Sequence, residues 1–262
     1  EISCSLVGSE MCIRDRYRAI VLVALMTMTQ LSTLAYDFTV GGIYYNILSN
    51  KKHTVSVTYK DPRTDQMITK SAYSGNVVIP STVTHNGVKY TVTEIGKKAF
   101  RFANNMSSVT LPNTIKTIRV LAFNMTGIVS INIPASVSKI EDGAFFQAKK
   151  LKTITVSPHN PYFKVEKDVL FNKKMTSLIY CTRGKVRKSY TVPSTVRKIS
   201  DLAFASCTIY KITINSNVTE FVGDPFNSIH FYESVNRTSN NAKREKNCGI
   251  PGWPGVCKHD KL

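Results

Sequence analysis

The chain has 262 residues, enough for one large domain or two small ones with a substantial hydrophobic core. It carries 35 lysines and arginines against 17 aspartates and glutamates, a formal net charge of +18 that favours acidic partners such as polysaccharides, nucleic acid or anionic surfaces. Only four cysteines lie beyond residue 35, which excludes a small scaffold held together by disulfides.

The first residues differ in character from the rest of the chain. Residues 5–16, SLVGSEMCIRDR, resemble the translation of an adapter used in transposase-based DNA library preparation. We interpret residues 1–16 as a sequencing artefact, the alternative being an unusual native leader. Under the first interpretation Cys4 and Cys12 carry no information about disulfides, metals or catalysis.

Residues 17–35 have the composition of a secretory signal peptide. A basic residue, Arg18, precedes an apolar stretch that fades into Thr, Gln and Ser and ends at the small residue Ala35. This order predicts cleavage after Ala35. The alternative, a membrane anchor, would need about 20 predominantly apolar residues. We therefore expect an exported chain, secreted or on the outer cell surface, with no transmembrane span after cleavage.

The next segment, residues 36–75, is predicted to form an N-terminal β cap. The stretches YDFTVGGIYYNIL (36–48) and HTVSVTY (53–59) alternate apolar and polar residues on either side of SNKK, a pattern typical of two paired strands. Such a cap would cover the apolar end of the structure that follows.

A repeat of 22 residues dominates the middle of the chain. Each copy has an apolar residue before a proline position, a valine or isoleucine after it, and a phenylalanine 11 residues beyond it, usually preceded by alanine. The clearest copies are VTLPNTIKTIRVLAF (109–123), INIPASVSKIEDGAF (131–145), YTVPSTVRKISDLAF (190–204) and ITINSNVTEFVGDPF (212–226). Self-similarity at this period is the signature of a solenoid.

Two further copies are interrupted. The first begins as VVIPSTV (77–83) and resumes as TEIGKKAF (93–100), and the segment between them contains Asn86-Gly87, a strong hairpin signal. The fourth begins as LKTITVSPHN (151–160) and departs into a second alternating pattern. We predict a solenoid over residues 76–231 with hairpin insertions near 84–92 and 158–189. Residues 232–262 are a non-repeat tail, for which disorder and a spurious sequence both stay open.

One repeat cannot bury its apolar side chains alone, so the copies must stack with equivalent residues above one another in a continuous core. The aromatic and branched positions of each copy are the expected core. These residues are Phe100, Phe123, Phe145, Phe204, Phe226, Ile118, Ile140 and Ile199.

The consensus IxIPxxVxxIxxxAF resembles the BspA-like class of leucine-rich repeats, found in secreted and surface proteins of anaerobic gut and oral bacteria and in some protozoa. The segment before the repeats is also similar to its counterpart in such proteins. The resemblance implies a β-rich α/β solenoid, a right-handed superhelix of about six coils, and a role in adhesion or protein binding.

No residue pattern indicates catalysis. The five histidines are scattered, and HExxH, GxSxG and glycine-rich phosphate loops are absent from the sequence. The adjacent carboxylates Glu141 and Asp142 are expected in an ordinary loop position of a repeat. Cys248, Cys257 and His259 lack a fourth metal ligand, and a disulfide between the two cysteines or free thiols both stay open. We predict a protein that is not an enzyme and has no cofactor or metal. The competing hypothesis is an enzyme fragment without its catalytic part.

The outward positions of the repeat strands are the first candidate binding surface. They are short, rich in hydroxyl groups and nearly uncharged, and the residues selected are Ser130, Asn132, Thr153, Thr155, Thr191 and Thr213. Solenoids commonly bind partners on such an extended sheet. Threonine also suits a half-exposed strand for structural reasons alone, so both explanations stay open.

A basic stripe is the second candidate. The residues selected are Arg183, Lys185, Arg187, Lys188 and Lys198, and the first three would point to one side of an extended chain. The stripe would suit sulfated or carboxylated glycans or an acidic protein patch. The alternative is a solvated face that keeps an exported protein soluble.

Taken together, the patterns predict a secreted or cell-surface bacterial protein that binds host extracellular proteins or other cells. The alternative function is binding of a polyanion, either acidic glycan or nucleic acid, through the basic stripe. Nucleic acid recognition by sequence is not expected.

Overall fold

The structure, a computed structural model, describes residues 35–61, 71–183, 187–205, 207–227 and 236–238. The chain divides into two units, Glu1–Leu34 and Ala35–Leu262, and all described residues belong to the second. The segments interpreted as artefact and signal peptide, except Ala35, therefore lie outside the described residues. So does most of the non-repeat tail.

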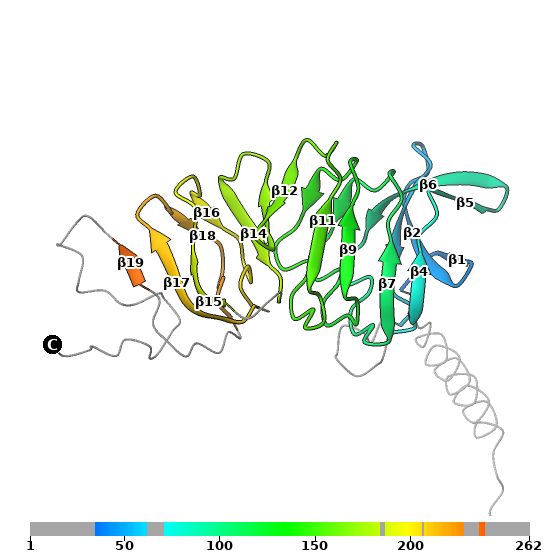
Figure 1. The fold of residues 1–262 in the computed structure, drawn as a ribbon. Coiled ribbons are helices and arrows are strands. Elements are labelled where there is room, and N and C mark those ends of the chain that lie inside the picture. Colours follow the sequence, from blue (N-terminus) through cyan, green and yellow to red (C-terminus); the bar gives the residue numbers. More distant parts are fainter. Residues whose placement is uncertain (1–34, 62–70, 184–186, 206, 228–235, 239–262) are drawn as a thin grey trace, which may run out of the picture. The chain divides into compact units, whose positions relative to one another are not determined.

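Every regular element of the described residues is a strand, and no helix occurs among them (Figure 1). The helical part of the expected α/β solenoid is therefore not confirmed. The short β-branched runs are separated by turns at proline and asparagine, which leaves no segment with the sustained 3.6-residue periodicity of a helix. Accordingly, no helix long and apolar enough to cross a membrane is found in this part of the chain.

An antiparallel sheet precedes the first repeat and consists of β1 (Phe38–Val40), β2 (Ile43–Ser49) and β3 (Thr54–Thr58). The two strands expected around SNKK are β2 and β3, and β1 adds a third. Gly41 and Gly42 form the turn between β1 and β2 at φ of 57° and 77°, a backbone conformation that glycine adopts without steric cost. β3 pairs in parallel with β6 (Val88–Ile95), so the cap continues into the repeats.

The repeats build two sets of parallel strands, which we call the long ladder and the short ladder. The long ladder contains β4 (Gly75–Val78), β7 (Met106–Thr110), β9 (Ser130–Ile133), β11 (Thr153–Val156), β15 (Arg187–Thr191), β17 (Ile209–Asn215) and β19 (Asn236–Thr238). The short ladder contains β6, β8 (Thr117–Ile118), β10 (Lys139–Ile140), β14 (Ser177–Cys181), β16 (Lys198–Ile199) and β18 (Glu220–Phe221).

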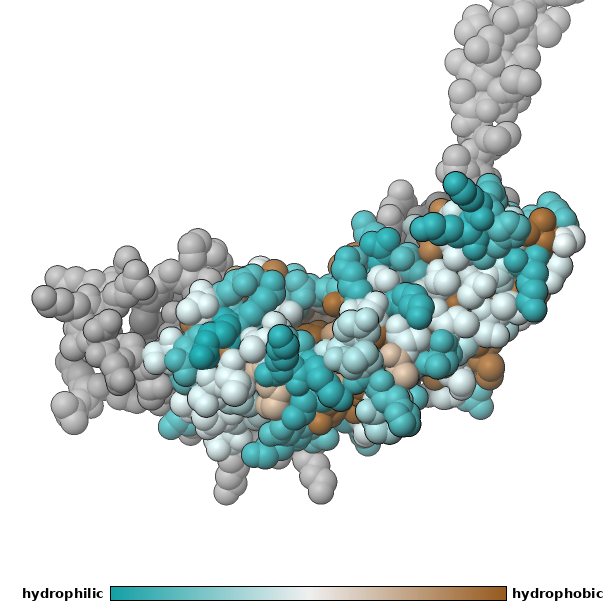
Figure 2. All heavy atoms as spheres, turned by 90° about the horizontal axis from the view of Figure 1, so that it is seen from above, coloured by the Kyte–Doolittle hydropathy of each residue, from teal (hydrophilic) through white to brown (hydrophobic). Residues whose placement is uncertain are grey.

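Pairing within the ladders is parallel throughout. In the long ladder β4 pairs with β7, β9 with β11, and β17 with both β15 and β19. In the short ladder β8 lies between β6 and β10, and β16 lies between β14 and β18. Seen along one side of this arrangement, hydrophilic residues cover most of the surface, with smaller apolar areas between them (Figure 2).

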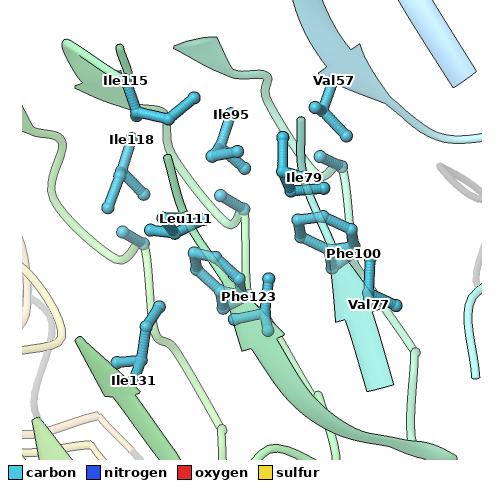
Figure 3. Close-up of a cluster of buried hydrophobic side chains, with 14 of the residues drawn as sticks. Val57, Val77, Ile79, Ile95, Phe100, Leu111, Ile115, Ile118, Phe123 and Ile131 are labelled. Atoms are coloured by element: carbon cyan, nitrogen blue, oxygen red, sulfur yellow. The ribbon is translucent and has the colours of Figure 1, made fainter. Parts of the chain in front are cut away.

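The core lies between the two ladders, and all eight expected core residues are at most 9% exposed. The ring centroids of Phe100 and Phe123 are 5.3 Å apart, those of Phe123 and Phe145 are 5.5 Å apart, and both pairs are stacked. Phe204 and Phe226 form a third stacked pair at 5.4 Å. Figure 3 shows Phe100 and Phe123 side by side, with Ile95 and Ile118 at the equivalent short-ladder positions.

Backbone hydrogen bonds hold the phenylalanine turns in register. The N–H of Phe100 donates to the carbonyl of Ala122 at 2.9 Å, and that of Phe123 donates to Ala144 at 2.8 Å. Four of the five phenylalanine turns also contain a residue with a left-handed backbone two positions before the phenylalanine. These residues are Lys98, Leu121, Gly143 and Leu202, with φ of 60°, 57°, 69° and 57°. Only glycine adopts this region without a steric penalty, so the repeat imposes some strain in the other three copies.

A hairpin forms where the sequence predicts one, and its turn extends away from the neighbouring coils (Figure 1). β5 (Thr82–His85) and β6 turn at Asn86-Gly87, with φ of 48° and 77°. β6 then continues as a strand of the short ladder, because its apolar residues Val92 and Ile95 face the core with 0% exposure. The hairpin shares a strand with the solenoid.

The second insertion contains β12 (Phe163–Glu166), β13 (Val169–Asn172) and β14, which pair as an antiparallel meander. It divides the core. One buried cluster runs from Phe38 to Tyr180 and a second from Val169 to Phe226. The expectation of one continuous core is therefore wrong, because β13 is buried on both faces and places alternate residues in different clusters.

Candidate binding surfaces

The uncharged surface predicted from the sequence lies on the long ladder. Register places Asn76 beside Ser108 and Val78 beside Thr110 on β4 and β7. On β9 and β11 it places Ser130 beside Thr153 and Asn132 beside Thr155. We call these residues the strand face: Asn76, Val78, Ser108, Thr110, Ser130, Asn132, Thr153 and Thr155. All are exposed except the half-buried Ser108.

Side-chain hydrogen bonds orient the two amides of the strand face. The hydroxyls of Ser107 and Ser108 donate to Oδ1 of Asn76 at 2.8 and 2.9 Å. Thr155 Oγ1 donates to Oδ1 of Asn132 at 3.0 Å. The Nδ2 groups of Asn76 and Asn132 have no hydrogen-bond partner in the described part of the chain. They are therefore available to an acceptor such as a peptide carbonyl.

Four of the six residues selected from the sequence lie together on this face: Ser130, Asn132, Thr153 and Thr155. The other two are neighbours on a different sheet, where exposed Thr191 of β15 lies beside half-buried Thr213 of β17. Lys211 faces Ser189 in the same register, so that sheet is not free of charge. The structure thus places the six residues on two sheets.

The basic stripe is divided in the same way. Arg187 belongs to β15 of the long ladder, whereas Lys198 belongs to β16 of the short ladder. Nζ of Lys198 contacts Oε1 of Glu220 at 2.8 Å, and this hydrogen bond raises the pKa of Lys198. Lys185 lies outside the described residues, and only the backbones of Arg187 and Lys188 are described. In the described part of the chain, the stripe is divided between the two ladders and Lys198 is paired with Glu220.

A set of ion pairs joins three successive coils on the short ladder. Arg119 contacts Oε1 of Glu94 at 3.0 Å and Oε1 of Glu141 at 2.9 Å, and Lys139 contacts Glu141 at 3.0 Å. Hydrogen bonds to Glu94 and Glu141 raise the pKa of Arg119. Burial alone would raise the pKa of Glu141, but hydrogen bonds from Lys139, the Val120 N–H and Arg119 together lower it. These charges stabilise neighbouring coils, a role that sequence reasoning did not assign to Glu141.

No reactive constellation is present among the described residues. No group of three or more His, Cys, Asp or Glu side chains in them could hold a metal ion. Cys181 and Cys207 are buried, and their thiols donate to the carbonyls of Thr182 and Phe204. His85 stacks on Phe38 with ring centroids 4.2 Å apart, which is a packing contact between β5 and β1. Cys248, Cys257 and His259 lie outside the described residues.

The repeats match a known protein family. A family model described as the BspA type leucine rich repeat region matches in six copies, over residues 66–186 and 181–248. These ranges cover more than half of the chain. The chain belongs to this family. The resemblance of its IxIPxxVxxIxxxAF consensus is thereby confirmed.

Several solved structures are similar to this BspA-type protein. A leucine-rich cell surface protein from Faecalibacterium prausnitzii A2-165 is 18% identical, with 72% of this chain and 73% of that chain covered and a TM-score of 0.43. A leucine-rich repeat protein from Eubacterium ventriosum ATCC 27560 is 20% identical, with 70% and 60% covered and a TM-score of 0.44. The pneumococcal vaccine antigen PcpA is 18% identical, with 78% and 71% covered and a TM-score of 0.35. No curated protein matches the chain.

Sequence reasoning missed one group of surface residues in this BspA-type protein. Lys149, Lys150 and Lys152 follow the third phenylalanine turn and lie against Arg183, 31 or more positions later in the chain. The available signal was the run KKLK itself. Its proximity to Arg183 depends on how the second insertion returns to the coil, which the repeat pattern does not specify.

Proposed function

We propose that this BspA-type repeat protein is exported and acts at the cell surface as a binding module for other proteins, including those of a host or of other cells, without catalysis. Its family suggests a protein-binding or cell-surface role. The proposal includes cleavage after Ala35, a right-handed superhelix of about six coils, and the limits of cap, solenoid and tail given above.

The strand face is the observation that supports this proposal. None of its eight residues is charged, although the chain has a net charge of +18. A protein partner can dock on such a surface without desolvating unpaired charges, which would be costly. The free amide groups of Asn76 and Asn132 would donate to carbonyl oxygens of the partner, and hydroxyls along the strands would add further polar contacts.

The test compares two variants that each add one positive charge. Asn132→Arg alters the centre of the strand face, whereas Ser138→Arg alters an exposed position just before β10 of the short ladder. Both are measured against host extracellular matrix proteins that the unaltered chain captures. We expect Asn132→Arg to weaken binding at least tenfold, a loss of about 1.4 kcal/mol, and Ser138→Arg to leave it unchanged. Equal losses in both variants would contradict a site on the strand face.

Salt distinguishes this function from the alternative one. Binding of a polyanion falls steeply with ionic strength because counterions are released on association, whereas contacts on an uncharged face depend far less on salt. A steep salt dependence for the captured protein would favour the polyanion alternative. Hydrolytic turnover of any ligand by the purified chain would contradict the absence of catalysis.

A further inference from the structure

A compact group of cations lies where the third and fourth coils meet. We call it the turn patch and define it as Lys149, Lys150, Lys152 and Arg183, all of which are exposed. The first three lie in and directly after the turn that leads into β11, and Arg183 follows β14. The patch therefore combines two segments that are more than 30 positions apart in the chain.

Three hydrogen bonds hold the two segments together. The backbone N–H of Arg183 donates to the carbonyl of Leu151 at 3.2 Å, and its guanidinium donates to the carbonyl of Lys149 at 3.3 Å. The hydroxyl of the buried Thr182 donates to the carbonyl of Lys152 at 3.0 Å. Because these bonds involve the lysine backbones, the three ammonium groups stay free to contact a ligand.

The charges of the turn patch have no structural partner among the described residues. None of the four side chains takes part in the ion pairs of this part of the chain, in contrast to Arg119, Lys139 and Lys198. The segments 146–152 and 181–183 contain no acidic residue. Like charges on two segments joined by hydrogen bonds repel one another, and a bound anion would relieve that repulsion.

The repeat scaffold does not require these cations. The equivalent turn after Phe123, residues 124–129 (NMTGIV), contains no charged residue, and residues 205–210 (ASCTIY) after Phe204 contain none either. A general need for solubility would distribute the charge over all the turns. The turn after Phe100 carries the single cation Arg101, whereas the turn after Phe145 carries both Lys149 and Lys150.

We propose that the turn patch binds an acidic glycan, a polysaccharide that carries sulfate or carboxylate groups. Flexible lysines suit scattered point charges of this kind. Proteins that bind single-stranded nucleic acid usually add aromatic side chains on which bases stack, but the exposed aromatic residue of the described chain, Tyr162, lies beyond the other end of β11. This site is separate from the strand face and goes beyond the proposed function.

The test uses two variants of the full chain that each remove four positive charges. The patch variant carries Lys149→Gln, Lys150→Gln, Lys152→Gln and Arg183→Gln. The control variant carries Lys51→Gln, Lys52→Gln, Lys89→Gln and Lys97→Gln, four exposed lysines without ion pairs among the described residues. A third variant changes only the three patch lysines, which keeps the hydrogen bond of Arg183 to Lys149 and so guards against misfolding.

Heparin and hyaluronan serve as sulfated and purely carboxylated probes, and dissociation constants are measured at several salt concentrations. We expect the patch variant to bind heparin at least about tenfold more weakly than the control variant, with a shallower salt dependence. The triple variant should lose most of that affinity. Binding of hyaluronan by the unaltered chain would show that carboxylate groups are sufficient for recognition. Binding of heparin without binding of hyaluronan would show that sulfate groups are required.

Three results would overturn the proposal. Equal losses in patch and control variants would show that net charge alone attracts the glycan. Failure of the unaltered chain to bind either polysaccharide at low salt would exclude the site. DNA of equal charge that binds as tightly, with the same dependence on the patch, would assign the ligand as nucleic acid. Protein capture by the strand face is measured on the same variants and should not change, so the two proposals fail separately.

Discussion

The two buried clusters of this solenoid differ in how they are built. The first, from Phe38 to Tyr180, is covered by the strands of the cap and contains three consecutive stacked phenylalanines. The second, from Val169 to Phe226, is smaller and contains one stacked pair. Among the described residues, the same repeat therefore contributes to two separate buried clusters.

β13 and β14 form the boundary between the clusters. Leu170 and Tyr180 belong to the first, whereas Val169, Phe171 and Cys181 belong to the second. The ring centroids of Tyr180 and Phe145 are 5.4 Å apart, so Tyr180 occupies the place where a repeat phenylalanine would otherwise stack. Contiguous regions of a protein can open with different free energies, so we expect the first cluster to be the more stable one.

The largest expected effect tests that difference at the phenylalanines. Phe145 lies in the first cluster and contacts the rings of Phe123 and Tyr180. Phe226 lies in the second cluster and stacks on Phe204. Phe145→Ala should lower the free energy of unfolding by about 3 to 5 kcal/mol through lost burial and a cavity, and Phe226→Ala should cost less. Denaturant unfolding measures both. Equal costs would show that the clusters do not differ, and an unchanged midpoint for Phe145→Ala would contradict its burial.

Two asparagines offer a second comparison. Buried Asn160 donates to the carbonyls of Pro134 at 2.8 Å and Val137 at 3.0 Å, and its Oδ1 accepts from the N–H groups of Tyr162 and Phe163, both at 2.8 Å. Asn160→Ala leaves these backbone groups without partners and should cost about 2 to 3 kcal/mol.

In the second cluster, half-buried Asn215 donates to Val192 at 3.0 Å and Pro193 at 3.1 Å and accepts from the N–H of Asn217 at 2.9 Å. Water can replace part of this network, so Asn215→Ala should cost only about 1 kcal/mol. Thermal unfolding of both variants measures which substitution costs more stability. A larger loss for Asn215→Ala would reverse the comparison.

Much of the fold follows from the repeat. Its period and apolar positions identify Phe100, Phe123 and Phe145 as neighbours, because stacking is the only way such short units bury their side chains. The Asn-Gly pair likewise identifies the turn between β5 and β6. These features depend on local sequence and on a rule that every copy obeys.

Other features were not predictable in the same way. Leu121 and Leu202 adopt a left-handed backbone that their side chains disfavour, so residue identity gives no signal for it. The boundary at β13 depends on both faces of one strand being buried, and an alternating pattern does not reveal that. The contact between Lys149 and Arg183 depends on the path of the second insertion. Tertiary packing decides all three.

Two buried tyrosines of the first cluster, Tyr73 and Tyr45, offer a third comparison with a smaller expected effect on stability. The hydroxyl of Tyr73 donates to the carbonyl of Thr58 at 2.6 Å and accepts from the N–H of Tyr44 at 3.1 Å. The hydroxyl of Tyr45 is buried without a hydrogen-bond partner among the described residues. Burial raises the pKa of both tyrosines, so both stay protonated near neutral pH.

Tyr73→Phe should therefore cost about 1 to 2 kcal/mol, because two backbone groups lose their partner. Tyr45→Phe removes only an unsatisfied group and should leave stability unchanged or slightly raised. Chemical denaturation of the two variants measures the difference. A cost for Tyr45→Phe as large as that for Tyr73→Phe would mean that its hydroxyl has a partner after all.

The smallest expected effect concerns Glu141, whose carboxylate joins the second and third coils of the first cluster. Its pKa is lowered in the folded chain from the ordinary value of 4.5, so the contribution is complete above pH 4.5 and is lost as pH falls through the lower, folded pKa. Glu141→Gln should cost at most about 1 kcal/mol at neutral pH, since Arg119 is partly solvated.

The stabilities of Glu141→Gln and of the unaltered chain should then converge as pH falls through the lowered pKa of the native carboxylate, which becomes protonated. Lys198→Gln, which removes the single pair with Glu220 near the second cluster, is the matched comparison. It should cost less at neutral pH, because one exposed contact is lost instead of a link between coils. If the difference in unfolding free energy between Glu141→Gln and the unaltered chain persists unchanged to low pH, the shape of the Glu141 side chain, and not its charge, accounts for its contribution to stability.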